Sequence, residues 1–149
     1  MKHAILLCLF LLVGTWQSAA QSAAQQVYDR ESILLEPSSG RFFKGNAIAQ
    51  RAGLFGQRLL PHMKGDEALN VMYESVRHQR IGYWTSIAGL GLVFVIPFVT
   101  TPAMLVTLGG VLILEGISYY HLLEGGDKLQ QAVWLHNRAI LADAAAPNP

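Results

Sequence analysis

The feature that most constrains this chain is an uncharged stretch of 34 residues, from 81 to 114. As one straight helix it would be about 51 Å long, whereas the hydrocarbon core of a bilayer is about 30 Å thick. The stretch therefore has to fold back. We place the break at residues 100–102 (Thr-Thr-Pro), because proline removes a backbone donor and disfavours helical geometry in the residue before it. This predicts two antiparallel transmembrane helices, 81–99 and 103–123.

Aromatic and charged residues mark one end of this predicted hairpin. Tyr and Trp favour the headgroup zone of a membrane, and the two open ends of the hairpin carry such rings while its turn does not. The charged residues that flank the spans fall on the same side. The rings are Tyr83, Trp84, Tyr119 and Tyr120, and the flanking charges are Arg77, Arg80, Glu124, Asp127 and Lys128.

Glu115 is the one ionisable residue well inside a predicted span, and such a residue is a functional-site hypothesis by default. Ser118 and Tyr119 lie three and four residues further on, on the same helix face, and His121 lies at the membrane boundary. These four residues form a candidate intramembrane polar cluster. Two readings stay open: a structural glutamate with hydrogen-bond partners, or a group that handles protons or ions.

Small residues recur at helical spacing in both spans. Such residues let helix backbones approach closely, which favours packing within the hairpin or self-association. The alternative is the ordinary use of glycine in membrane helices. The candidate helix-packing residues are Gly82, Ser86 and Gly89 in the first span and Ala103, Thr107 and Gly110 in the second.

The N-terminus predicts a secretory signal peptide over residues 1–20. Lys2 and His3 are followed by ten apolar residues, 4–13, and then by small ones, the three parts of such a signal. Ten residues make a helix of only about 15 Å, too short for a comfortable span. We expect cleavage before Gln21 or Gln25. The single cysteine, Cys8, would be lost with the signal, which excludes disulfides and cysteine-based metal sites from the mature chain.

The remaining segments complete an all-α prediction. Residues 21–40 are expected to form an extended lead-in, in which the apolar patch 33–35 has no partner strand. Residues 41–80 are expected to form a small helical soluble segment. It holds a short amphipathic helix that ends at Pro61 and a second helix with Asp66 as its N-cap.

The C-terminal part is predicted to form a separate amphipathic helix over 127–142. It would follow the Gly125-Gly126 pair, with Asp127 as its cap and Gln130 three residues later. Residues 143–149 are expected to form a disordered tail.

Composition argues against several function classes. Charged residues make up only 14% of the chain, against roughly 25% in a typical soluble domain. The formal net charge is +1, so no basic excess marks a nucleic-acid partner. The histidines do not follow a metal-binding spacing, and no nucleophile or cofactor motif occurs. We therefore expect a protein that is not an enzyme and needs no cofactor or metal.

Two segments carry a resemblance to a protein family. Residues 42–46 (Phe-Phe-Lys-Gly-Asn) and 128–137 (Lys-Leu-Gln-Gln-Ala-Val-Trp-Leu-His-Asn), with the spans between them, resemble small exported membrane proteins from Bacteroidetes-type bacteria, most of them uncharacterised. The resemblance covers about residues 41 to 141. His136 stands where that family has a tyrosine, and the front turn reads Gly-Asn in place of Asn-Gly. The resemblance implies an envelope location, but neither an activity nor site residues.

Two function classes follow. The first is a non-enzymatic protein of the bacterial cell envelope with a structural or protein-interaction role, anchored by the hairpin. Its partners would be the lipid bilayer and a second copy or another envelope protein. The second is a small ion- or proton-handling or transport subunit that uses Glu115. The signal peptide favours both termini outside the cytoplasm, although Arg77 and Arg80 beside the first span favour the opposite orientation.

Overall fold

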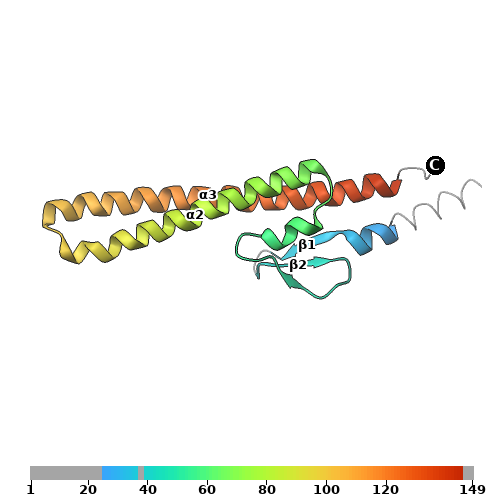
Figure 1. Ribbon diagram of the computed structural model, residues 1–149, viewed down its shortest axis with the longest axis horizontal. Coiled ribbons are helices and arrows are strands. Elements are labelled where there is room, and N and C mark those ends of the chain that lie inside the picture. Colours follow the sequence, from blue (N-terminus) through green and yellow to red (C-terminus); the bar gives the residue numbers. More distant parts are fainter. Residues whose placement is uncertain (1–24, 37–38, 146–149) are drawn as a thin grey trace, which may run out of the picture. The chain divides into compact units, whose positions relative to one another are not determined.

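The computed structural model describes residues 25–36 and 39–145 (Figure 1). The predicted signal peptide and residues 146–149 of the predicted tail lie outside these residues. The described chain is mostly helical, with one small β-sheet, so the all-α prediction was incomplete. It divides into two compact units. The sheet unit contains the described residues up to Arg51 together with Val133 onward, and the hairpin unit contains Ala52–Ala132.

The sheet unit is built on three short antiparallel strands in the order β1 (Ile33–Glu36), β2 (Arg41–Lys44) and β3 (Gln50–Arg51). Leu34 lies opposite Phe43, and the side chains of Ile33 and Phe42 are fully buried. A helical segment, 25–31, precedes β1. The expected lead-in without a partner strand was therefore wrong, because β2 supplies the partner.

The last turns of α3 (Thr101–Ala145) complete the core of the sheet unit. The Asn137 side chain accepts a hydrogen bond from the Ile33 N–H at 2.8 Å and donates one to the Ile33 carbonyl at 2.9 Å. It thus pairs with the outer edge of β1 as a neighbouring strand would. His136 and Ile140 are buried in the same unit, and a ring nitrogen of His136 lies 3.2 Å from the Glu31 carbonyl.

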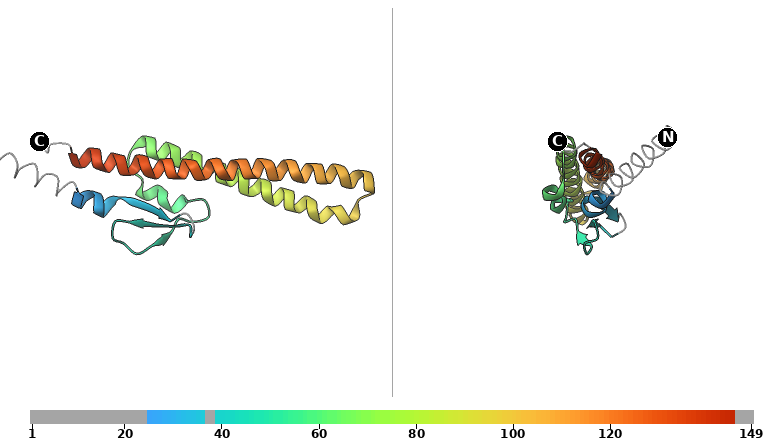
Figure 2. Two further views of the ribbon diagram at one scale, coloured as in Figure 1. Left: turned by 180° about the vertical axis from the view of Figure 1, so that it is seen from behind. Right: turned by 90° about the vertical axis from the view of Figure 1, so that its right-hand side faces the viewer.

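The hairpin unit contains η1 (Gln57–His62), α2 (Asp66–Val95), η2 (Ile96–Phe98) and the first part of α3. Figure 2 shows α2 and this part of α3 running antiparallel, joined by a short connection. The break between the two α-helices lies at residues 96–100, slightly before the predicted 100–102, and α2 ends at Val95 where the first span was predicted to end at 99. Pro97 lies in η2, and Pro102 lies in the first turn of α3, where a missing N–H costs no helical hydrogen bond.

At the base of the hairpin, away from its turn, both long helices continue beyond the predicted boundaries of the two spans. The expected soluble helix and the first span form the single helix α2, which starts after Gly65, so Asp66 lies in the first turn and is not the N-cap. The second span and the expected helix 127–142 form the single helix α3, and Asp127 lies in its interior.

Gly125 shows why the Gly125-Gly126 pair does not end a helix. A Cβ added at Gly125 would lie 2.6 Å from Cγ of Gln79 and 3.2 Å from the Ser75 carbonyl oxygen. This glycine therefore serves the close approach of α2 and α3, and its φ is not positive as a helix C-cap would require.

The short amphipathic helix expected before Pro61 does not form. The segment holds β3 and η1 in its place, and Pro61 lies inside η1. Gly53 and Gly56 take φ values of 88° and 70°, which a continuous α-helix does not contain. Leu59 of η1 is fully buried, with Met72 of α2 also in the core of the hairpin unit.

Gly82 offers a direct test of the close helix approach. An added Cβ would lie 2.8 Å from Cγ of Leu122 and 2.9 Å from the Ser118 carbonyl oxygen. We expect Gly82→Ala to destabilise the protein by about 1 to 3 kcal/mol through overpacking. Thermal unfolding in one mild detergent measures the effect.

Gly91→Ala is the matched control, because a Cβ at Gly91 meets nothing within 4 Å on the same helix. It should be neutral or slightly stabilising, since alanine is the better helix former. Equal unfolding midpoints for the two variants would contradict the close packing described here.

Candidate functional site

Mostly small and polar residues form the contact between α2 and α3, and from Ser75 to Ser86 they recur on α2 at every third or fourth position. The contacts run from the charged base of the hairpin toward its turn. They are, in order, Glu74 with Lys128, Ser75 with Gly125, His78 with His121, Gly82 with Ser118, Ser86 with Glu115, and Leu92 with Gly110. We call this set the polar ladder. It holds the helices in one register and is the candidate site.

Glu115 is part-buried and lies in the half of the polar ladder that is nearer the hairpin turn. The Ser86 hydroxyl lies 3.4 and 3.3 Å from its two carboxyl oxygens, both long for hydrogen bonds of this type. An added Cβ at Gly89 would lie 2.7 Å from Oε1 of Glu115. The carboxyl group therefore occupies a recess that Gly89 leaves open, with Ser86 as its polar neighbour.

The structure does not bring the predicted cluster of Glu115, Ser118, Tyr119 and His121 together. The Ser118 hydroxyl is buried and donates to the Gly82 carbonyl at 2.8 Å. Tyr119 is 67% exposed, and His121 contacts His78. The neighbour of Glu115 is thus Ser86, which spacing alone had assigned to helix packing.

Of the predicted helix-packing residues, some lie in the contact between α2 and α3 and others do not. Gly82, Ser86 and Gly89 on α2 all face α3, and Gly110 faces Leu92, whose Cδ1 would lie 3.5 Å from an added Cβ. Ala103 and Thr107 do not join the ladder. The Thr107 hydroxyl donates to the Ala103 carbonyl at 2.8 Å within α3.

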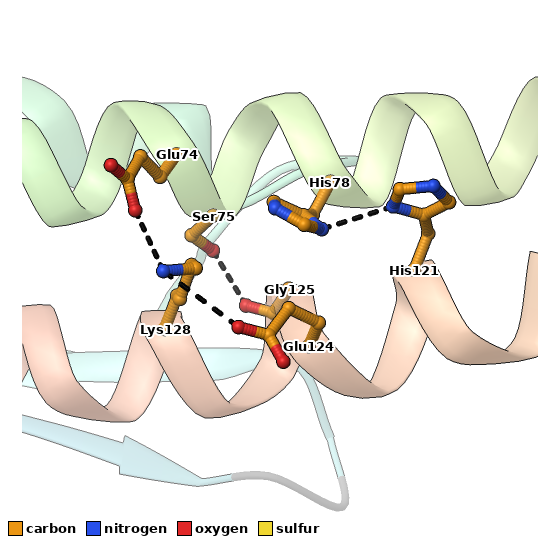
Figure 3. Close-up of polar contacts among 7 residues, drawn as sticks. All are labelled: Glu74, Ser75, His78, His121, Glu124, Gly125 and Lys128. Atoms are coloured by element: carbon orange, nitrogen blue, oxygen red, sulfur yellow. Dashed lines mark hydrogen bonds and ion pairs between the residues drawn. The ribbon is translucent and has the colours of Figure 1, made fainter.

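His78 and His121 form a contact that the sequence analysis missed. Their Nδ1 atoms lie 3.0 Å apart and their ring centroids 5.0 Å apart, with both residues part-buried (Figure 3). One ring has to donate and the other accept, so the hydrogen bond needs at least one neutral ring. The residues are 43 positions apart. Extending the predicted fold-back by register past the spans would have placed them opposite each other.

The base of the ladder is charged. Nζ of Lys128 lies 2.7 Å from Glu74 and 3.7 Å from Glu124 (Figure 3). The hydrogen bond and charge of Lys128 lower the pKa of Glu74, and the hydrogen bond to Glu74 raises the pKa of Lys128. Any stabilisation from this pair is therefore present at neutral pH. It is lost as the pH falls through the lowered pKa or rises through the raised one.

Next to this ion pair, the Ser75 side chain of α2 bonds to the backbone of α3. Its buried hydroxyl donates to the Gly125 carbonyl at 2.7 Å (Figure 3). Nε2 of Gln79 lies 3.1 Å from the same hydroxyl. The polar groups of the ladder thus satisfy one another across the helix interface. Among residues 25–36 and 39–145, no group of three or more potential metal ligands occurs.

The sheet unit has an open hollow of about 450 Å³ beside Tyr28, Asp29 and Phe43. Asn137 also lines it, but both polar atoms of that amide are already bonded to Ile33. Ser32 also lines it, but the one carboxyl group there, that of Asp29, is exposed and accepts a hydrogen bond from the Gln25 side chain at 2.8 Å, so it does not serve Ser32 as a general base. The polar ladder therefore stays the better candidate site.

Two substitutions at Glu115 separate a packing role from an ion-handling role. Glu115→Gln keeps the shape and a polar contact to Ser86, so we expect wild-type stability. Glu115→Ala empties the recess beside Gly89 and should cost about 1 to 3 kcal/mol. Unfolding midpoints in detergent and the phenotype in the host are compared. Loss of the host phenotype in the Gln variant at unchanged stability would favour ion handling.

No protein-family model, no curated protein and no solved structure matches this chain.

Proposed function

We propose that this chain is a non-enzymatic membrane protein of the bacterial cell envelope. In this proposal the hairpin formed by α2 and α3 crosses the bilayer over residues 81–123. The parts outside the membrane have a structural or protein-interaction role, with a second copy or another envelope protein as partner. One observation carries the proposal: the helices bury their small and polar residues against each other and expose their large apolar ones.

This distribution of side chains is the reverse of that in a water-soluble protein. In the most apolar 18-residue segment of Asp66–Phe98 only 11% is buried within the protein, and in that of Thr101–Ala145 only 6%. The core helix of a soluble protein would have these side chains inside, since exposed apolar area costs roughly 25 cal/mol per Å² in water. The outward-facing residues include Leu90, Val93, Phe94, Leu105, Val106, Leu112, Ile113 and Ile117.

The dimensions of the hairpin and its aromatic residues also fit a bilayer. Residues 81–98 would span about 27 Å as a helix, close to a hydrocarbon core of about 30 Å. Gly82 contacts Ser118, which puts Tyr83 and Trp84 at the level of Tyr119 and Tyr120. All four rings are exposed, as expected for side chains in the headgroup zone.

The alternative function is ion or proton handling at Glu115. Its place within the apolar part of the hairpin favours this role. The contacts toward the turn favour it less, because the next step of the ladder is Leu92 against Gly110. A chain of polar groups that reached Glu115 from the base would therefore end there, which supports the packing role.

Cysteine labelling tests the membrane burial. Phe94→Cys and Leu112→Cys place a thiol where the native side chains are 76% and 74% exposed, in a chain that carries Cys8→Ser. We expect both thiols to resist a water-soluble maleimide in membranes, because lipid covers them. Leu34→Cys is the control, since Leu34 is 67% exposed on the sheet and should react quickly. Equal reaction rates at all three positions would contradict a membrane hairpin.

The orientation needs a separate experiment. We propose that both termini lie outside the cytoplasm, because a signal peptide commits the chain to export before the spans are inserted. Alkaline phosphatase fused after Pro149 should then be active. An inactive phosphatase, with activity from a cytoplasmic reporter at the same position, would show that Arg77 and Arg80 set the orientation.

A further inference from the structure

A stripe of exposed basic and aromatic side chains runs along α2 where the helix reaches the uncharged stretch. Tyr73, Arg77, Arg80 and Trp84 follow one another at spacings of four, three and four residues, which places them on one helix face. All four are exposed, with Trp84 at 64%. The stripe thus carries two guanidinium groups just before Ile81 and one large ring just after it.

The loop before η1 adds a further aromatic ring, that of Phe55, beside this stripe. The Arg80 guanidinium carbon lies 5.8 Å from the centre of the Phe55 ring, and an Arg80 nitrogen lies 3.4 Å from the Gln57 side-chain oxygen. Phe55 in turn meets Tyr83 edge to face at 5.6 Å. These neutral neighbours orient Arg80 without compensating its charge. We call Phe55, Arg77, Arg80, Tyr83 and Trp84 the arginine-aromatic patch.

Within the described residues, no carboxylate lies within ion-pair distance of either arginine of the patch. The acidic residues closest in the ladder, Glu74 and Glu124, both lie within ion-pair distance of Lys128, and the charge of Arg77 acts on Glu74 only from further away. The patch therefore presents two exposed guanidinium groups that no carboxylate of the described residues contacts directly.

We infer that the arginine-aromatic patch binds the phosphate of an anionic phospholipid headgroup. Guanidinium groups match phosphate oxygens through two parallel hydrogen bonds, and Tyr and Trp rings favour the same depth of the membrane. Arg80 precedes the first residue of the uncharged stretch directly, so its charge lies at the headgroup level of a hairpin that crosses the bilayer. This inference rests on the proposed membrane insertion and adds the lipid class that the hairpin selects.

Tryptophan quenching tests this inference in the full chain. With Trp16→Phe and Trp134→Phe, Trp84 is the only remaining tryptophan. The protein is reconstituted in equimolar phosphatidylglycerol and phosphatidylcholine, with bromine on the acyl chains of one lipid or the other. We expect brominated phosphatidylglycerol to quench Trp84 more strongly, since each arginine should enrich the anionic lipid about fivefold.

The double variant Arg77→Gln, Arg80→Gln should quench equally with both brominated lipids. The matched control is Arg30→Gln, Arg41→Gln, which removes two exposed charges from the sheet unit and should keep the preference. Equal quenching in the unmodified patch, or equal loss in the control, would overturn the inference. A chain that neither lipid quenches would instead refute the membrane insertion itself.

A last arm distinguishes a lipid headgroup from a free phosphate ligand. Inorganic phosphate is added in place of sodium chloride at the same ionic strength. The preference for phosphatidylglycerol should stay unchanged, because the headgroup is held beside Trp84 by its acyl chains. Its loss in phosphate alone would assign the patch to a soluble phosphate compound and overturn the lipid assignment.

Discussion

The close approach of α2 and α3 at Gly82 is the constraint on which the rest of the hairpin depends. The Ser118 hydroxyl reaches the Gly82 carbonyl at 2.8 Å only because Gly82 has no side chain. Gly89 leaves space for the Glu115 carboxyl group in the same way. Once small and polar groups fill the interface, the large apolar side chains have to point outward. Their exposure is thus a consequence of how the helices meet, and lipid is the solvent that suits it.

The same register continues past the apolar stretch to the base of the hairpin. Ser75 bonds to the Gly125 carbonyl, and Lys128 bridges Glu74 and Glu124. Within the apolar part the ladder uses uncharged contacts and one carboxyl group, whereas at the base it uses an exposed ion pair. Exposed pairs of this kind add little stability in water. In the proposed membrane hairpin, the role of this pair would be to match the two helix faces outside the bilayer.

The sequence predicted the hairpin well because its signals are physical limits of length and backbone geometry. An uncharged stretch too long for one crossing, with Pro102 inside it, leaves few alternatives.

The strands were harder to predict, since β1 and β2 have four residues each and depend on the joint burial of Ile33 and Phe42. The continuity of α3 was missed because glycine ends some helices and brings others together, and only the partner helix decides which. The contact of His78 with His121 likewise requires the register of two helices, which no local pattern contains.

Asn137 shows how little sequence can be needed to terminate a sheet. Its amide bonds to both backbone groups of Ile33, so at this residue the outer edge of β1 is already occupied from a helix. An open strand edge is a template on which other chains can assemble. A single side chain, offering one donor and one acceptor, blocks that template at Ile33. At Ile33 the edge of β1 is therefore protected by one helical side chain, with no further strand needed there.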